Sequence, residues 1–179
     1  MNEEINGDLV AHTLPDGARI TLRPLEPTDA LAVREIFEHL SPTSRYQRFL
    51  APKTHLTSAD LRQLLSVDHC THEAVIAFDE RGVHPIGVAR FIRGYGVHPE
   101  VAEIAVEVVD AWHWRGVGSA LTAALVLRAY ALEVLQFSAY VAHGNLGATS
   151  LMRRVPGRLG RVGSESGAAE YRLVLDPAC

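Results

Sequence analysis

The feature that most constrains this chain is a strand that leads through a short loop into a glycine-marked helix start. Residues 101–109 are rich in valine and have the pattern of a strand. After the loop 110–115, Gly116 and Gly118 open a long apolar helix. N–H groups at a helix N-terminus lack intrahelical partners and carry partial positive charge, and glycine leaves an anion room to approach. The sequence therefore predicts an anion-binding turn at this junction.

The hydrophobic spacing of the remaining chain predicts one domain of alternating strands and helices. Residues 1–18 are predicted to form an N-terminal tail, and residues 19–179 a single domain. The predicted strands cover residues 19–23, 74–78, 86–92, 101–109, 137–141, 159–162 and 170–175. The predicted helices cover residues 30–40, 44–50, 58–65, 116–135 and 145–154. This order indicates an α/β fold in which helices cover both faces of a mixed sheet, and the two short helices after residue 43 are expected to face the core.

Composition and charge exclude several classes of protein. A hydrophobic content of 47% with 21% charged residues is typical of a globular domain. The net charge of -4 and the scattered basic residues argue against a nucleic-acid partner. The most apolar stretch, residues 120–127, is far shorter than the roughly 20 residues that span a bilayer, so no membrane span is expected. The N-terminus lacks the pattern of a secretory signal, which together with the cysteine usage predicts a cytoplasmic location.

No metal site is predicted. Cys70 and Cys179 have neither disulfide nor zinc spacing. The run 68–72 holds an aspartate, a cysteine and two histidines, but no second pair of ligands follows at metal distance. This run is therefore expected to be a structural loop.

Other glycine-rich loops fit the junction poorly. A Walker A loop needs a lysine after the glycines, and none is present. A dinucleotide fingerprint needs a small residue where Leu121 stands, and its first glycine follows the strand directly. A tight turn that only packs a helix against a strand stays open as an alternative.

Several segments resemble one enzyme family. Residues 106–120, with their strand, aromatic-rich loop and glycine pair, resemble motif A of the GCN5-related N-acetyltransferases (GNAT). Residues 20–30 are similar to that family's first strand and helix start, and residues 145–151 to its later helix. Residues 40–49 and 102–105 resemble the acetyltransferase domain of bacterial protein lysine acetyltransferases. The resemblance implies a mostly antiparallel sheet with one splayed parallel pair.

The same resemblance implies acetyl-CoA as co-substrate, with its pyrophosphate on the glycine turn and its thioester carbonyl on the backbone of Val108 and Val109. Asn145 would contact the pantetheine arm, although as the first residue of a helix it is equally an N-cap. The implied cofactor-binding residues are Val108, Val109, His113, Trp114, Arg115, Gly116, Val117, Gly118, Ser119 and Asn145.

The resemblance also implies transfer of the acetyl group to a primary amine by direct attack in a ternary complex. The acceptor is a protein lysine or a small-molecule amine, and a homodimer stays open. A lysine ammonium, with a pKa of about 10.4, must lose a proton before it attacks. Glu103 matches the position of the family's glutamate base. Glu107 is the second choice, because its even spacing from Glu103 places both on one face of the strand.

One departure from the family supports a different reading. The tyrosine that many members use as general acid would fall at Met152, which cannot donate a proton. A thiolate with a thiol pKa of about 8.5 leaves without such help, and water can protonate it. The alternative to an enzyme is a non-catalytic module that binds acyl-CoA for regulation.

Overall fold

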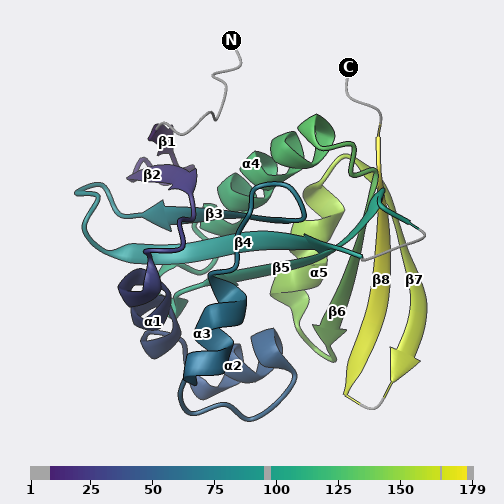
Figure 1. Ribbon diagram of the computed structural model, residues 1–179, viewed down its shortest axis with the longest axis horizontal. Helices are drawn as coiled ribbons and strands as arrows, with labels where there is room; N and C mark the ends of the chain where they lie inside the picture. The colour runs from purple at the N-terminus through teal and green to yellow at the C-terminus, as the bar shows by residue number, and fades with distance from the viewer. Residues whose placement is uncertain (1–8, 95–97, 166, 177–179) are drawn as a thin grey trace.

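The computed structural model describes residues 9–94, 98–165 and 167–176 (Figure 1). In these residues the strands are β1 (Val10–Thr13), β2 (Arg19–Pro24), β3 (His72–Phe78), β4 (Pro85–Arg93), β5 (Val101–Val108), β6 (Gln136–Ala142), β7 (Gly157–Glu165) and β8 (Ala168–Leu175). The α-helices are α1 (Ala30–Glu38), α2 (Pro42–Phe49), α3 (Ser58–Leu64), α4 (Val117–Ala131) and α5 (Leu146–Arg154). All the described strands lie in one sheet with the order β1-β2-β3-β4-β5-β6-β8-β7, in which only β5 and β6 pair in parallel. The predicted mixed α/β fold is confirmed.

The N-terminal segment differs from the predicted tail. Val10–Thr13 forms the edge strand β1, which pairs antiparallel with β2. The hairpin turn closes through a hydrogen bond from the Gly17 N–H to the Leu14 carbonyl, and Leu14 is buried in the core. The prediction of a tail over residues 1–18 is therefore wrong for residues 10–18. The four-residue strand carries too short an apolar pattern to be recognised from sequence, since three of its residues are exposed.

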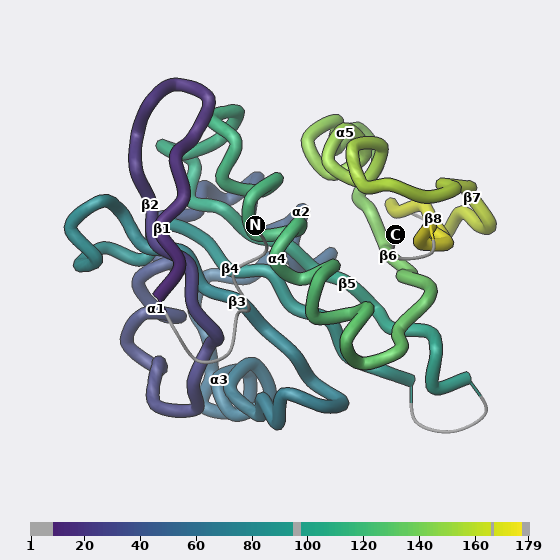
Figure 2. The backbone as a smooth tube through the Cα atoms, turned by 90° about the horizontal axis from the view of Figure 1, so that it is seen from above, coloured from purple at the N-terminus to yellow at the C-terminus, as the bar shows by residue number. Residues whose placement is uncertain are grey.

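Helices cover both faces of the sheet, as predicted. On one face, the buried carboxylate of Glu73 on β3 pairs with Arg128 of α4 at 2.9 Å. On the other face, Arg90 of β4, the cross-strand partner of Ala74, donates a 2.6 Å hydrogen bond to the Leu64 carbonyl at the end of α3. Neighbouring residues of a strand point to opposite faces, so these contacts place α3 and α4 on opposite sides (Figures 1 and 2).

The sheet divides at its parallel pair. β5 and β6 are in register only from Val101 to Glu103, opposite Gln136 to Ser138. Beyond this point β6 continues to Ala142 with β8 on its other side, while β5 stays paired with β4. The two strands therefore diverge, and the part of β5 after Glu103 presents a backbone edge to the space between them (Figure 2).

The ladder between β4 and β5 fixes which backbone groups face this space. The Val109 N–H donates to the Ile86 carbonyl at 2.9 Å. In an antiparallel pair the residues alternate between bonding to the partner and pointing away from it. Val108, opposite Gly87, is the next residue along, and its N–H and carbonyl face the divergence.

Candidate functional site

A cavity of about 790 Å³ occupies the space where β5 and β6 diverge. Its walls come from α2, β5, the loop and turn before α4, the end of β6, and α5. Nine of the predicted site residues line it: Glu103, Glu107, Val108, His113, Trp114, Gly116, Gly118, Ser119 and Asn145. The structure thus brings most of the predicted site together in one place.

The glycine turn has the geometry of an anion site. Gly116 is the N-cap of α4 with a φ of 104°, and no side chain caps the helix among the described residues. The first intrahelical bond runs from the Ala120 N–H to the Gly116 carbonyl. The N–H groups of the three residues between them therefore have no acceptor within the helix. Gly118 and Ser119 line the cavity, so these donors lie at its wall.

Three predicted site residues lie outside the cavity lining. The Val117 side chain is fully buried in the core, so only its backbone is available to a ligand. Val109 uses its N–H for Ile86 and is not free to bind a thioester. The Nε of Arg115 contacts Asp16 at 2.7 Å, and its guanidinium lies 4.0 Å from the centre of the Trp112 ring. Arg115 therefore joins the turn before α4 to the β1–β2 turn, and its contact with a phosphate stays a prediction.

Glu103 and Glu107 occupy different environments although both line the cavity. Glu103 is exposed, and stands where β5 leaves β6. Glu107 is buried, with Arg48 Nε at 3.3 Å from one carboxylate oxygen and Arg90 Nη2 at 3.7 Å from the other. Burial is the main cause that lowers the pKa of Arg90 to about 10. The negative charge of Glu107 raises this pKa, and the positive charge of Arg48 lowers it. These contacts favour a structural role for Glu107 and leave Glu103 accessible as a base.

The wall made by α2 was missed from the sequence. The helix has no fully buried residue, and Thr43, Ser44, Gln47 and Arg48 line the cavity. Its start is fixed by Ser41, whose hydroxyl accepts from the Ser44 N–H and whose own N–H donates to Asp110 at 3.1 Å. The expectation that this helix faces the core holds for Phe49, which packs against Phe37 of the core, and is wrong for the polar residues that line the cavity. A Ser-Pro start before a mostly polar helix was the signal that could have shown an exposed face.

The residues on α5 and the end of β5 have defined partners. Asn145 is the N-cap of α5, since its Oδ1 accepts from the Ala148 N–H at 3.0 Å, and it also lines the cavity. His113 Nε2 lies 2.7 Å from the Val108 carbonyl, which points away from β4. Met152 is 8% exposed and packs with Ala139 and Val141, so the predicted tyrosine position is apolar here.

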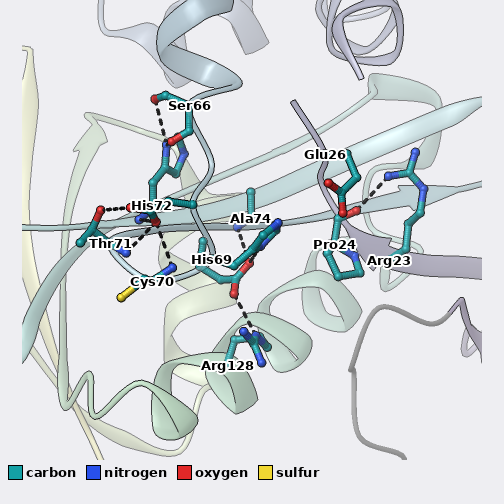
Figure 3. Close-up of polar contacts among 12 residues, drawn as sticks. Arg23, Pro24, Glu26, Ser66, His69, Cys70, Thr71, His72, Ala74 and Arg128 are labelled. Carbon is teal, nitrogen blue, oxygen red and sulfur yellow. Dashed lines mark hydrogen bonds and ion pairs between the residues drawn. The ribbon is translucent and has the colours of Figure 1, made fainter. Parts of the chain in front are cut away.

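The run 68–72 forms a tightly bonded loop (Figure 3). Asp68 Oδ1 accepts the N–H groups of Cys70, Thr71 and His72 at 2.7 to 2.9 Å. Burial raises the pKa of Asp68, but these bonds and that from the Thr71 hydroxyl outweigh it and hold the pKa well below its usual range.

No helix in the described part of the chain is long and apolar enough to cross a membrane.

Comparison with known proteins identifies the family. A family model for the GNAT acetyltransferase domain matches residues 19–157. Acetyltransferase Pat of Mycolicibacterium smegmatis is 34% identical over 142 residues, which cover 79% of this chain and 40% of that protein. Acetyltransferase PA5475 of Pseudomonas aeruginosa is 27% identical over 124 residues, covering 68% of this chain and 66% of that protein. The chain therefore spans only part of the curated relatives it matches.

Solved structures agree. The GNAT domain of the PAT protein of S. lividans superposes with a TM-score of 0.84 and 26% identity, covering 93% of this chain and 97% of that one. The acetyltransferase yncA of Salmonella typhimurium, solved with acetyl-CoA, shares the fold at a TM-score of 0.66 and 20% identity, covering 89% and 95% of the two chains. The splayed parallel pair, the glycine turn and the family match together show that this chain belongs to the GNAT family of acetyltransferases.

Proposed function

We propose that the protein transfers an acetyl group from acetyl-CoA to a primary amine by direct attack in a ternary complex. The observation that carries this proposal is the shared cavity, which joins the helix N-terminus at Gly116, the outward backbone of Val108 and the exposed carboxylate of Glu103. The reaction needs a site that binds the anionic pyrophosphate, a donor that polarises the thioester carbonyl, and a base. The helix N-terminus, the backbone of Val108 and the carboxylate of Glu103 offer these three groups.

The cofactor would lie along the divergence of β5 and β6. Its pyrophosphate would accept hydrogen bonds from the N–H groups of Val117, Gly118 and Ser119 at the positive end of α4. Its thioester oxygen would accept from the Val108 N–H, which stabilises the negative charge that develops there during attack. The Salmonella protein of the same fold binds acetyl-CoA, which supports this assignment.

The chemistry needs one base and one nucleophile. Glu103 accepts a proton from the ammonium, directly or through water, and the neutral amine attacks the thioester carbon. The carbon–sulfur bond then breaks, and coenzyme A leaves as a thiolate. The new amide nitrogen gives its second proton to solvent, and the thiolate takes a proton from water. No tyrosine is needed for this last step, because the thiol has a pKa of about 8.5 and is a fair leaving group.

The acceptor is a protein lysine or a small-molecule amine, and the site of action is the cytoplasm. The exposed free thiol of Cys70 suits a reducing compartment. The named relatives are bacterial acetyltransferases, which supports a bacterial enzyme of this class.

A second candidate function is a non-catalytic module that binds acyl-CoA. The buried Met152 in the cavity wall favours this function. A tyrosine at this position could donate a proton to the leaving thiolate, whereas methionine cannot. This module would bind the cofactor as the enzyme does but would transfer no acetyl group.

Release of the coenzyme A thiol in the presence of a panel of amines separates the two functions. The panel contains a lysine-bearing peptide, a diamine and free amino acids, and acetyl-CoA without amine gives the hydrolysis background. With an amine that the parent acetylates, Glu103→Gln is expected to lower kcat by roughly 10²-fold or more, with unchanged affinity for acetyl-CoA. Glu80→Gln, an exposed glutamate in the β3–β4 turn, is the matched control and keeps the parental rate.

Each outcome decides between the readings. Turnover that survives Glu103→Gln at the parental rate would show that Glu103 is not the base. Binding of acetyl-CoA with no turnover on any amine of the panel would favour the non-catalytic module.

A further inference from the structure

The indole of Trp114 stands exposed at the edge of the cavity. Its exposed fraction is 76%, and the neighbouring wall residue Leu146 is 73% exposed. Both residues line the cavity, together with Gly116 and Ser119 of the glycine turn. Removing large apolar side chains from water is favourable in free energy. Trp114 and Leu146, which are exposed beside an anion site, are therefore suited to contact the apolar part of a ligand.

The position of the indole is set from two sides. The backbone of Trp114 has a φ of 61°, a left-handed conformation that a bulky residue rarely adopts. A Cβ added at Gly147 would lie 3.9 Å from Cζ2 and 4.0 Å from Cη2 of the indole, so one edge of the ring rests over the first turn of α5. The rest of the ring is left open to solvent.

The other tryptophan of the chain is used differently. Trp112 also lines the cavity, but it is half-buried against the core and the guanidinium of Arg115 lies 4.0 Å from the centre of its ring. Its ring is therefore engaged within the fold. Trp114, two residues later, has an open ring face beside the donors of residues 117–119.

We infer that Trp114 is a stacking platform for the adenine ring of coenzyme A. The inference rests on the proposed function, which places the pyrophosphate on the N–H groups that begin three residues after Trp114. The adenosine is attached to that pyrophosphate, and its adenine ring is the one flat, aromatic part of the cofactor. Stacking of a nucleobase on an aromatic side chain needs only an open ring face, which Trp114 presents.

Binding of two cofactor fragments to matched variants tests the inference. The probes are coenzyme A and 4′-phosphopantetheine, which keeps one phosphate but lacks the second phosphate and the 3′-phosphoadenosine, and the dissociation constants are measured by calorimetry. Trp114→Leu keeps an apolar side chain but removes the aromatic face. It is expected to weaken coenzyme A about five- to thirtyfold, as for loss of one base stack, and to leave 4′-phosphopantetheine unchanged. Trp114→Phe is expected to retain most of the affinity.

Fluorescence gives a second measurement. In a Trp112→Phe background, Trp114 is the remaining tryptophan of the chain. Coenzyme A is expected to quench its emission because the adenine stacks on the indole, whereas 4′-phosphopantetheine leaves the emission unchanged. Leu31→Ala, an exposed apolar residue on α1, is the control for loss of any surface side chain.

The outcomes separate this inference from the proposed function. Equal weakening of both probes by Trp114→Leu would mean that the residue only shapes the turn, and the inference would be overturned. Unchanged affinity for coenzyme A in Trp114→Leu would overturn it as well, while cofactor binding itself would stand. Failure of the parent protein to bind either probe would overturn the proposed function and the adenine site with it.

Discussion

Substitution of Gly116 by alanine tests the link between the β1–β2 hairpin and the glycine turn. Gly116 has a φ of 104°, which alanine adopts only with strain. The added Cβ would also lie 2.8 Å from Cδ of Pro15, closer than side chains normally approach. Both effects act on the residue that begins α4, so stability and cofactor binding are expected to fall together.

The magnitude follows from these two contributions. The left-handed backbone costs an alanine about 1 to 2 kcal/mol of folding free energy. Crowding against the proline ring adds about 1 to 3 kcal/mol, as for an extra methylene in a packed region. The total of about 2 to 4 kcal/mol corresponds to a fall in Tm of roughly 5 to 15 °C for a domain of this size.

Gly82→Ala is the matched control, because it isolates the backbone effect. Gly82 has a φ of 67°, and no atom lies within 4 Å of its added Cβ. This variant is expected to lose only about 1 to 2 kcal/mol and to bind acetyl-CoA as the parent does. A Gly116→Ala/Pro15→Ala double variant should recover part of the difference, since it removes the crowded ring.

Urea unfolding and calorimetric titration with coenzyme A measure the two quantities. If Gly116→Ala unfolded at the same urea concentration as Gly82→Ala and bound coenzyme A normally, the contact with Pro15 would carry no energy. The hairpin and the glycine turn would then not be coupled.

Two further predictions concern carboxylates with different roles. Glu107→Gln leaves the guanidiniums of Arg48 and Arg90 without their counter-charge, and is expected to lower the free energy of unfolding by about 3 kcal/mol or more. Glu103→Gln, at an exposed site, is expected to leave the urea midpoint of unfolding unchanged. Equal midpoints for the two variants would contradict this difference. Asp68 has a lowered pKa, so its stabilising contribution is present above the unfolded pKa of about 3.9 and is lost as the pH falls towards the folded value. Asp68→Asn should therefore lower the free energy of unfolding most near pH 7, with a difference that shrinks below about pH 4 in urea titrations; a difference independent of pH would refute the assignment.

The sequence predicted the elements with strong periodicity and clear ends. The strands β3, β4 and β5 and the helix α4 were found because valine-rich runs and apolar spacing are long there. The start of α3 at residue 58 was also predicted, and a capping box between Thr57 and Asp60 forms this start. β1 was missed because four residues at a sheet edge carry little pattern.

The glycine turn was predicted from local spacing and its neighbouring site residues from the family resemblance, whereas contacts between distant segments were not predicted. The pairing of Arg115 with Asp16 joins residues 99 positions apart, and Arg48 meets Glu107 from a separate helix. Such contacts depend on how the elements pack, which no local pattern records. The same limit explains why the role of α2 as a cavity wall was not predicted.

The divergence of β5 from β6 leaves the sheet with a narrow seam. Three cross-strand pairs join the part that contains β1 to β5 with the part that contains β6, β8 and β7, although the helices add contacts between them. A cofactor lying in the seam would touch both parts and so act as a removable cross-link. Because such a ligand binds the folded form alone, it would slow amide hydrogen exchange in both diverging strands, β5 and β6, more than elsewhere in the sheet.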